Sequence, residues 1–128
     1  MKSLKELVDN SEEWGRQLIQ SIKSVRGVKG DTGKPPIFQG VLNLFPNAVE
    51  AVADVSAFGA KKYSWNNWKN VDDGVNRYTD AMIRHLLKES KGELLDAETN
   101  LLHACSVAWN ALARLELMLI EYDRQKGS

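Results

Sequence analysis

Residues 84–104, RHLLKESKGELLDAETNLLHA, decide how the second half of the chain folds. The segment reads as the end of one helix, a turn at Gly92 and the start of another helix, because a glycine interrupts a helical pattern of leucines. It contains both histidines of the chain, His85 and His103, with several carboxylates between them. The segment therefore predicts either a metal-binding site or a charged, solvent-exposed helical turn.

Apolar residues recur at helical spacing along most of the chain, and no segment alternates as a strand does. We expect helices over 3–25, from Asn47 to about Tyr63, from Asp72 or Asp73 to about Ser90, and from Asp96 to about Arg124, with the polar first residues as N-caps. Segment 26–46 has four glycines and all three prolines, which predicts a long loop. The sequence thus predicts one all-α domain over 1–128 with a four-helix, bundle-like architecture, comprising the helix 1–25, the loop 26–46 and a three-helix region 47–124.

The composition excludes several classes of function. Lys and Arg together number 17, as do Asp and Glu, so there is no cationic excess for binding duplex nucleic acid. No run approaches the ~18 apolar residues that cross a bilayer. Cys105 is the only cysteine, which excludes an intrachain disulfide and fits a reducing compartment. We expect a cytoplasmic protein that contacts neither duplex nucleic acid nor membrane.

A polar stripe is expected along the last predicted helix. Steps of 3, 4, 3 and 4 residues place the following side chains on one face: Asp96, Thr99, His103, Ser106 and Asn110. The opposite face is apolar and includes Leu112, Leu115 and Leu119. The polar stripe could be a plain solvent face, but short hydrogen-bonding side chains and a histidine favour a partly enclosed pocket.

Three residues have two interpretations each. Glu98 is either a first-turn carboxylate favoured by the helix dipole or one turned inward, which needs a cation. Glu50 shares a surface face with Asp54 and Lys61, and gains a role only if another helix covers it. His85 is either a core-edge histidine with one hydrogen bond or a functional group.

Carboxylates on neighbouring helices are a common way to hold a divalent cation near phosphates. Such an ion can activate water for attack on phosphorus, and Arg or Lys can neutralise phosphate oxygens. Tryptophan or tyrosine can stack on a base. All of these residue types occur between positions 47 and 104.

An ordered series of motifs resembles a known family. The series covers about residues 30–120 and comprises GKPP (33–36), NAVEAVADVSAFGAKKY (47–63), NNW (66–68), YTDAMIRHL (78–86), GELLDAET (92–99) and LLHA (101–104). It is similar to the N-terminal domains of phage dATP/dGTP diphosphohydrolases. The resemblance implies a MazG-like all-α protein of the host cytoplasm. Such enzymes cleave nucleoside triphosphates between the α and β phosphates, with Mg²⁺ or Mn²⁺ held by acidic residues.

The resemblance and the polar stripe together suggest roles for individual residues. The expected metal ligands are Glu50, Glu93, Asp96 and Glu98. The expected catalytic residues are Glu98, His85 and His103. The expected substrate-binding residues are Lys61, Lys62, Tyr63, Asn67, Trp68 and Arg84.

Two departures from the family pattern keep a second hypothesis open. Ser106 stands where the pattern has a second histidine, three residues after His103, and the paired E-x-x-E motif of MazG proteins is absent. The alternative is therefore a phage protein that binds or sequesters a nucleotide without hydrolysing it. We also expect a homodimer or homotetramer, because Leu117, Met118 and Tyr122 widen the apolar arc of the last helix beyond one side.

Overall fold

A computed structural model of the protein describes residues 12–18 and 33–127. The chain divides into two compact units, Met1–Pro36 and Ile37–Ser128. In the first unit residues 12–18 are helical, which confirms that part of the expected N-terminal helix. The rest of the expected helix 3–25, and residues 26–32 of the expected loop, lie outside the described residues. A single domain over 1–128 stays a prediction.

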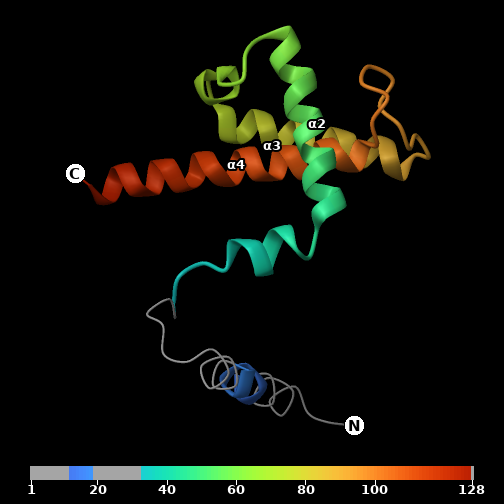
Figure 1. Cartoon of the computed structure of the whole chain (residues 1–128). Coiled ribbons are helices and arrows are strands. Elements are labelled where there is room, and N and C mark those ends of the chain that lie inside the picture. The colour runs from blue at the N-terminus through green and yellow to red at the C-terminus, as the bar shows by residue number, and fades with distance from the viewer. Residues whose placement is uncertain (1–11, 19–32, 128) are drawn as a thin grey trace. The chain divides into compact units, whose positions relative to one another are not determined.

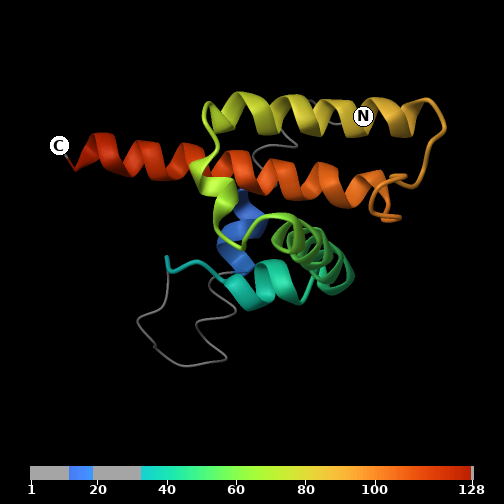
Figure 2. The ribbon, with the colours of Figure 1, turned by 90° about the horizontal axis from the view of Figure 1, so that it is seen from above.

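The second unit is built from helices alone, which confirms the all-α fold class. Its described elements are η1 (Phe38–Leu42), α2 (Pro46–Lys62), η2 (Asn67–Asn70), α3 (Gly74–Ser90) and α4 (His103–Lys126). The helices α3 and α4 run antiparallel side by side, and α2 crosses this pair at a steep angle (Figures 1 and 2). No described helix is both long and apolar enough to cross a membrane.

The start of α2 differs from the sequence prediction, and the start of α3 agrees with it. Pro46 occupies the first turn of α2, where its missing N–H costs nothing, so the expected N-cap at Asn47 is wrong. Phe45 precedes α2 without a side-chain cap. Asp73 precedes α3 in a left-handed conformation, with φ 54°, so the expected start is confirmed, but its side chain makes no capping hydrogen bond to the backbone. Its Oδ1 accepts a hydrogen bond from the side-chain Nδ2 of Asn76 at 3.1 Å instead.

The end of α3 is fixed by Gly92. The N–H of Gly92 donates to the carbonyl of Glu89 and that of Glu93 to the carbonyl of Lys88, both at 3.0 Å. This is the Schellman pattern, in which the residue after the C-cap takes a left-handed conformation that glycine adopts without strain. Gly92 has φ +99°, so the predicted break is confirmed.

The last helix begins seven residues later than expected, at His103 instead of Asp96. Residues 94–103 form a closed turn, in which the N–H of Asp96 donates to the carbonyl of Leu101 at 2.8 Å and that of His103 to Leu94 at 3.0 Å. Asp96 Oδ1 accepts the N–H of Glu98 at 2.7 Å, so the aspartate caps a turn and not a helix. Asn100, with φ 61°, leaves the helical conformation altogether.

The buried face of α4 is the predicted polar stripe. The buried residues of α4 are His103, Ser106, Asn110 and Ala113, again at steps of 3, 4 and 3. A plain solvent face is therefore the wrong interpretation of this stripe. Leu112, Leu115 and Leu119, on the other side, are at least half exposed.

Candidate metal centre and pocket

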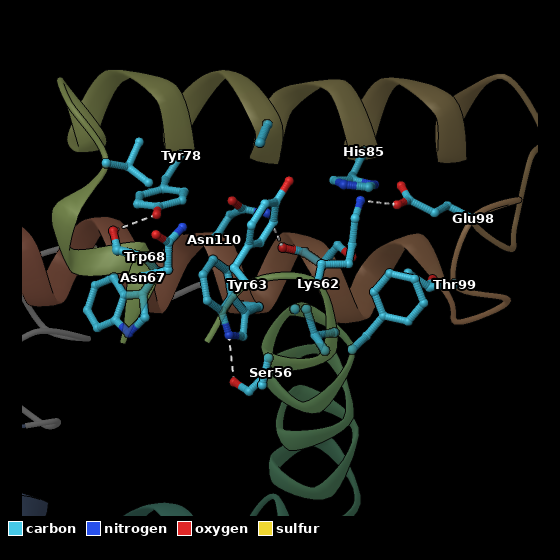
Figure 3. A pocket seen from close by; sticks show the side chains of 18 of the residues that line it. Ser56, Lys62, Tyr63, Asn67, Trp68, Tyr78, His85, Glu98, Thr99 and Asn110 are labelled. Carbon is cyan, nitrogen blue, oxygen red and sulfur yellow. Dashed lines mark hydrogen bonds and ion pairs between the residues drawn. The ribbon is translucent and has the colours of Figure 1, made fainter. Parts of the chain in front are cut away.

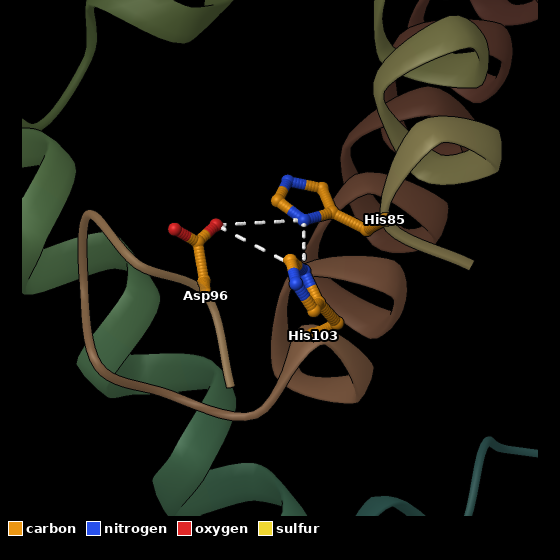
Figure 4. Close-up of side chains that lie close together, drawn as sticks. All are labelled: His85, Asp96 and His103. Carbon is orange, nitrogen blue, oxygen red and sulfur yellow. Dashed lines mark hydrogen bonds and ion pairs between the residues drawn. The ribbon is translucent and has the colours of Figure 1, made fainter. Parts of the chain in front are cut away.

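The two histidines of the chain face each other across the α3–α4 pair. His85 lies near the end of α3 and His103 is the first residue of α4. Because these helices are antiparallel, the end of one lies beside the start of the other, and the two Nδ1 atoms are 2.8 Å apart (Figure 4). His103 is fully buried, and the side chain of His85 is 22% exposed.

The position of the proton on His103 follows from its other neighbour. His103 Nε2 lies 2.8 Å from Glu93 Oε2. An ionised carboxylate can only accept a hydrogen bond, so Nε2 carries the proton and, in the neutral ring, Nδ1 carries a lone pair. This lone pair is directed at His85 Nδ1, where it meets either an N–H of His85 or a cation.

Asp96 completes the cluster from the turn before α4. Its Oδ2 is 3.5 Å from His85 Nδ1 and 4.0 Å from His103 Nδ1. Burial raises the pKa of Asp96, but hydrogen bonds from the backbone of Glu98 and Thr99, with the nearby histidines, outweigh burial and hold its pKa below the usual value. Desolvation lowers the pKa of His85, although Asp96 opposes this effect. Near neutral pH, a carboxylate therefore faces an uncharged His85.

These three residues form a group that fits a metal ion. One ligand atom from each of His85, Asp96 and His103 lies within 4.8 Å of the others. Neutral imidazole nitrogens and a carboxylate oxygen are ordinary metal ligands, and the lone pair of His103 already faces the centre of the group. Within residues 12–18 and 33–127, this is the only such cluster of histidine, cysteine and acidic side chains.

A pocket of about 660 Å³ adjoins this group. Its walls come from the end of α2, from η2, from α3 and α4, and from the turn between them (Figure 3). His85 and Asp96 belong to its lining, as do Ser106 and Asn110 of the polar stripe. The metal-binding group therefore lies at the edge of a space large enough for a small organic ligand.

Three aromatic rings form one wall of the pocket. Trp68, Tyr78 and Trp109 meet edge to face, with ring centroids 5.6 to 6.4 Å apart. The Tyr78 hydroxyl donates to the carbonyl of Trp68 at 2.6 Å, and Trp109 Nε1 donates to Ser56 Oγ at 2.8 Å. These bonds hold the rings in place, and such a wall suits a flat aromatic group.

Three cationic side chains also line the pocket. Arg77 and Arg84 come from α3, and no carboxylate among the described residues forms an ion pair with either of them. Lys62, at the end of α2, lies 2.5 Å from Glu98 Oε1, and both side chains are about half exposed. The hydrogen bond to Glu98 raises the pKa of Lys62. The pocket is therefore suited to an anionic ligand.

The structure brings most of the predicted substrate-binding residues together. Five of the six line the pocket, namely Lys62, Tyr63, Asn67, Trp68 and Arg84, whereas Lys61 does not. Of the predicted catalytic residues, His85 and Glu98 line the pocket, and His103 lies buried against His85. Their roles stay predictions.

The four predicted metal ligands do not lie together in the structure. Asp96 is in the histidine cluster, and Glu93 contacts His103 from the far side of the ring. Glu98 pairs with Lys62 instead, and Glu50 lies exposed on α2 outside the pocket lining. The metal-binding group therefore contains two histidines where the sequence predicted carboxylates.

Several lining residues had no assigned role in the sequence prediction. Arg77, Tyr78 and Trp109 all line the pocket. Tyr78 could have been found, because it lies seven residues before His85 and so on the same face of α3. Trp109 directly precedes Asn110 of the polar stripe, at its edge. Nothing in the sequence singles out Arg77.

Comparisons with known proteins point to one family. The model of the family described as dATP/dGTP diphosphohydrolase, N-terminal, matches residues 24–126. A dATP/dGTP diphosphohydrolase of Salmonella phage PMBT28 is 38% identical over 82 residues, which make up 64% of this chain and 26% of that protein. The chain thus spans about a quarter of the length of this relative. No solved structure matches the chain.

Proposed function

The chain belongs to the family of dATP/dGTP diphosphohydrolase N-terminal domains, and from this premise we propose that it is a metal-dependent nucleoside triphosphate pyrophosphohydrolase. The proposed substrates are the purine deoxynucleotides in the name of the phage relative. The proposed reaction cleaves the bond between the α and β phosphates. A divalent ion, expected from the sequence to be Mg²⁺ or Mn²⁺, would be required.

One observation carries this proposal. A single pocket combines unpaired arginines, an aromatic wall and the edge of a group that fits a metal ion. Arg77 and Arg84 line this pocket and would neutralise phosphate oxygens, and the rings of Trp68, Tyr78 and Trp109 would provide a surface for a purine. A nucleoside triphosphate carries both the anionic phosphates and the flat aromatic base that such a pocket would bind.

In the proposed reaction, a water oxygen forms a bond to the α phosphorus while the bond from that phosphorus to the bridging oxygen breaks. Pyrophosphate leaves, a deoxynucleoside monophosphate remains, and the proton of the water passes to a base. Glu98 is our candidate for this base, since its carboxylate lines the pocket and pairs with Lys62. An ion held by His85, Asp96 and His103 would polarise a phosphate oxygen.

The test is to identify the products by ³¹P NMR after incubating each of the four dNTPs with the protein and Mg²⁺ or Mn²⁺. The proposal predicts monophosphate and pyrophosphate from dATP and dGTP. Release of inorganic phosphate or triphosphate would contradict the proposed bond, and turnover without a divalent ion would contradict metal dependence.

A second candidate function is nucleotide binding without turnover. It is favoured by Ser106, which is buried in the pocket lining at the position where the family pattern has a histidine. A serine is a much poorer metal ligand than histidine. If this alternative holds, dATP or dGTP will bind and can be recovered intact after denaturation of the protein.

We also propose that the chain acts as a homo-oligomer. An apolar groove of about 320 Å³ lies between α2 and α4, lined by Val52, Leu112, Leu115, Leu119 and others. The family match over residues 24–126 contains both walls of this groove. We propose that a second copy of the chain covers these apolar walls.

Light scattering during size-exclusion chromatography tests the oligomer. Leu115→Lys in the groove is expected to give monomers, and the control Leu87→Lys, on an exposed position of α3, is expected to leave the oligomer intact. A wild-type protein that is monomeric at all concentrations would contradict the proposal.

A further inference from the structure

The geometry of the histidine cluster points to the kind of metal that it binds. We propose that His85, Asp96 and His103 form a three-ligand centre for a first-row transition-metal ion, selected over Mg²⁺, with Glu93 as the group that orients His103. This inference concerns metal binding alone and does not depend on nucleotide hydrolysis.

The three donor atoms lie at the right separations for one ion. The sides of their triangle are 2.8 Å between the two Nδ1 atoms, and 3.5 Å and 4.0 Å from these atoms to Asp96 Oδ2. The circle through three such points has a radius of about 2.0 Å, which matches metal–nitrogen and metal–oxygen bond lengths in zinc sites. A single ion can therefore reach all three donors without movement of the backbone.

The chemistry of the donors favours transition metals. Two of the three are imidazole nitrogens, which suit Zn²⁺, Fe²⁺, Co²⁺ and, less strongly, Mn²⁺. Mg²⁺ prefers oxygen ligands in an octahedral arrangement and gives up its water reluctantly. A site with one carboxylate and two imidazoles would therefore bind Mg²⁺ weakly, even where Mg²⁺ is the more abundant ion.

Glu93 supplies the support that metal-binding histidines commonly have. Its carboxylate accepts the Nε2–H of His103 at 2.8 Å, which fixes the tautomer whose Nδ1 is free to bind a metal. The side chain of Glu93 is about half exposed, while the histidine that it contacts is fully buried.

One side of the centre remains available to a ligand. His85 and Asp96 line the pocket, whereas His103 is fully buried. An ion at this point would thus have protein ligands on the buried side and open coordination positions toward the pocket. Three protein ligands with an open position are typical of catalytic metal sites, while structural sites are closed by four.

Cobalt(II) provides a direct test, since its visible absorption reports the coordination number and the presence of nitrogen ligands. The full chain, freed of metal with a chelator, is titrated with Co²⁺ and followed by its d–d absorption bands. We expect one equivalent to bind with the strong bands of a four- or five-coordinate site, and Mg²⁺ in about 100-fold excess to leave the bands unchanged. Bands of weak, octahedral intensity, or their loss on adding Mg²⁺, would overturn the proposal.

Substitutions locate the centre. His85→Ala and Asp96→Asn should each abolish the strong bands. Both variants are checked for helix content by circular dichroism, and Asp96→Asn keeps an oxygen that can accept the N–H of Glu98. The control is Glu50→Gln, which removes an exposed carboxylate of α2. Loss of the bands in Glu50→Gln, or their persistence in folded His85→Ala, would contradict the assignment.

Discussion

The Nδ1 atoms of His85 and His103 lie 2.8 Å apart, although 18 positions separate these residues in the sequence. Two nitrogen atoms at this distance must share a proton or a cation, because two lone pairs would repel each other. The first case links α3 to the start of α4 by a hydrogen bond, and the second links them through a metal. In both cases the contact ties the turn 94–103 to the end of α3.

The contact between Glu93 and His103 should control metal affinity. Glu93→Ala removes the acceptor of Nε2–H, so the affinity for Co²⁺ should fall roughly 10- to 100-fold. Glu93→Gln should have a smaller effect, since its amide oxygen can still accept the hydrogen bond. Competition against a coloured chelator measures the dissociation constant for Co²⁺ of each variant. Equal affinity in Glu93→Ala and the wild type would show that Glu93 does not support the centre.

Arg84 should contribute to the binding of nucleotide phosphates. A hydrogen bond to a charged group contributes about 1.5 to 3 kcal/mol, so Arg84→Ala should weaken dATP or dGTP binding roughly 10- to 100-fold. Calorimetry with the nucleotide measures the change. The control is Lys88→Ala, which removes one cation from an exposed position on the same helix, outside the pocket lining. Equal losses in the two variants would indicate only an effect of net charge.

Replacement of Gly92 should lower the stability of the fold. Its φ of +99° is one that alanine adopts only with strain, so Gly92→Ala should lower the free energy of unfolding by about 1 to 2 kcal/mol. Gly59 provides the opposite case. It lies inside α2, where an added Cβ meets no atom within 4 Å, so Gly59→Ala should raise that free energy by about 0.5 to 1 kcal/mol. Urea unfolding of both variants checks the signs, and two shifts of the same sign would contradict the turn geometry.

The hydrogen bond from Trp109 to Ser56 should link α4 to α2. Trp109→Phe keeps an aromatic ring but removes the donor of a 2.8 Å bond, and Ser56→Ala removes the acceptor. A double-mutant cycle in urea unfolding should give a coupling free energy of about 0.5 to 1.5 kcal/mol. Additive effects of the two substitutions would mean that this bond contributes nothing measurable to stability.

The sequence predicted α2, α3 and α4 as helices, because each has a regular apolar or polar stripe. It failed at the start of α4. Asp96 has the residue type and spacing of an N-cap, yet its side chain closes a turn, and backbone bonds between residues 94 and 103 prevent a helix there. The local preference of Asp96 for an N-cap was overridden by the hydrogen bonds of this turn.

The candidate site was predicted only in part, and for a related reason. Arg84, Lys62 and Trp68 line the pocket as the resemblance suggested. The pairing of His85 with His103 depends on the register between α3 and α4, which the closed turn sets and which no spacing in the sequence reveals. The carboxylates Glu50 and Glu98 were expected near the metal, but Glu98 pairs with Lys62 of α2 and Glu50 lies outside the pocket lining.

The most direct test of the metal centre is anomalous diffraction from crystals of the protein grown with Mn²⁺. Data collected on both sides of the manganese absorption edge identify the element and its position. The account predicts one peak of anomalous density about 2.0 to 2.3 Å from His85 Nδ1, His103 Nδ1 and a carboxylate oxygen of Asp96. A peak coordinated by Glu50 or Glu98 without the two histidines would contradict it.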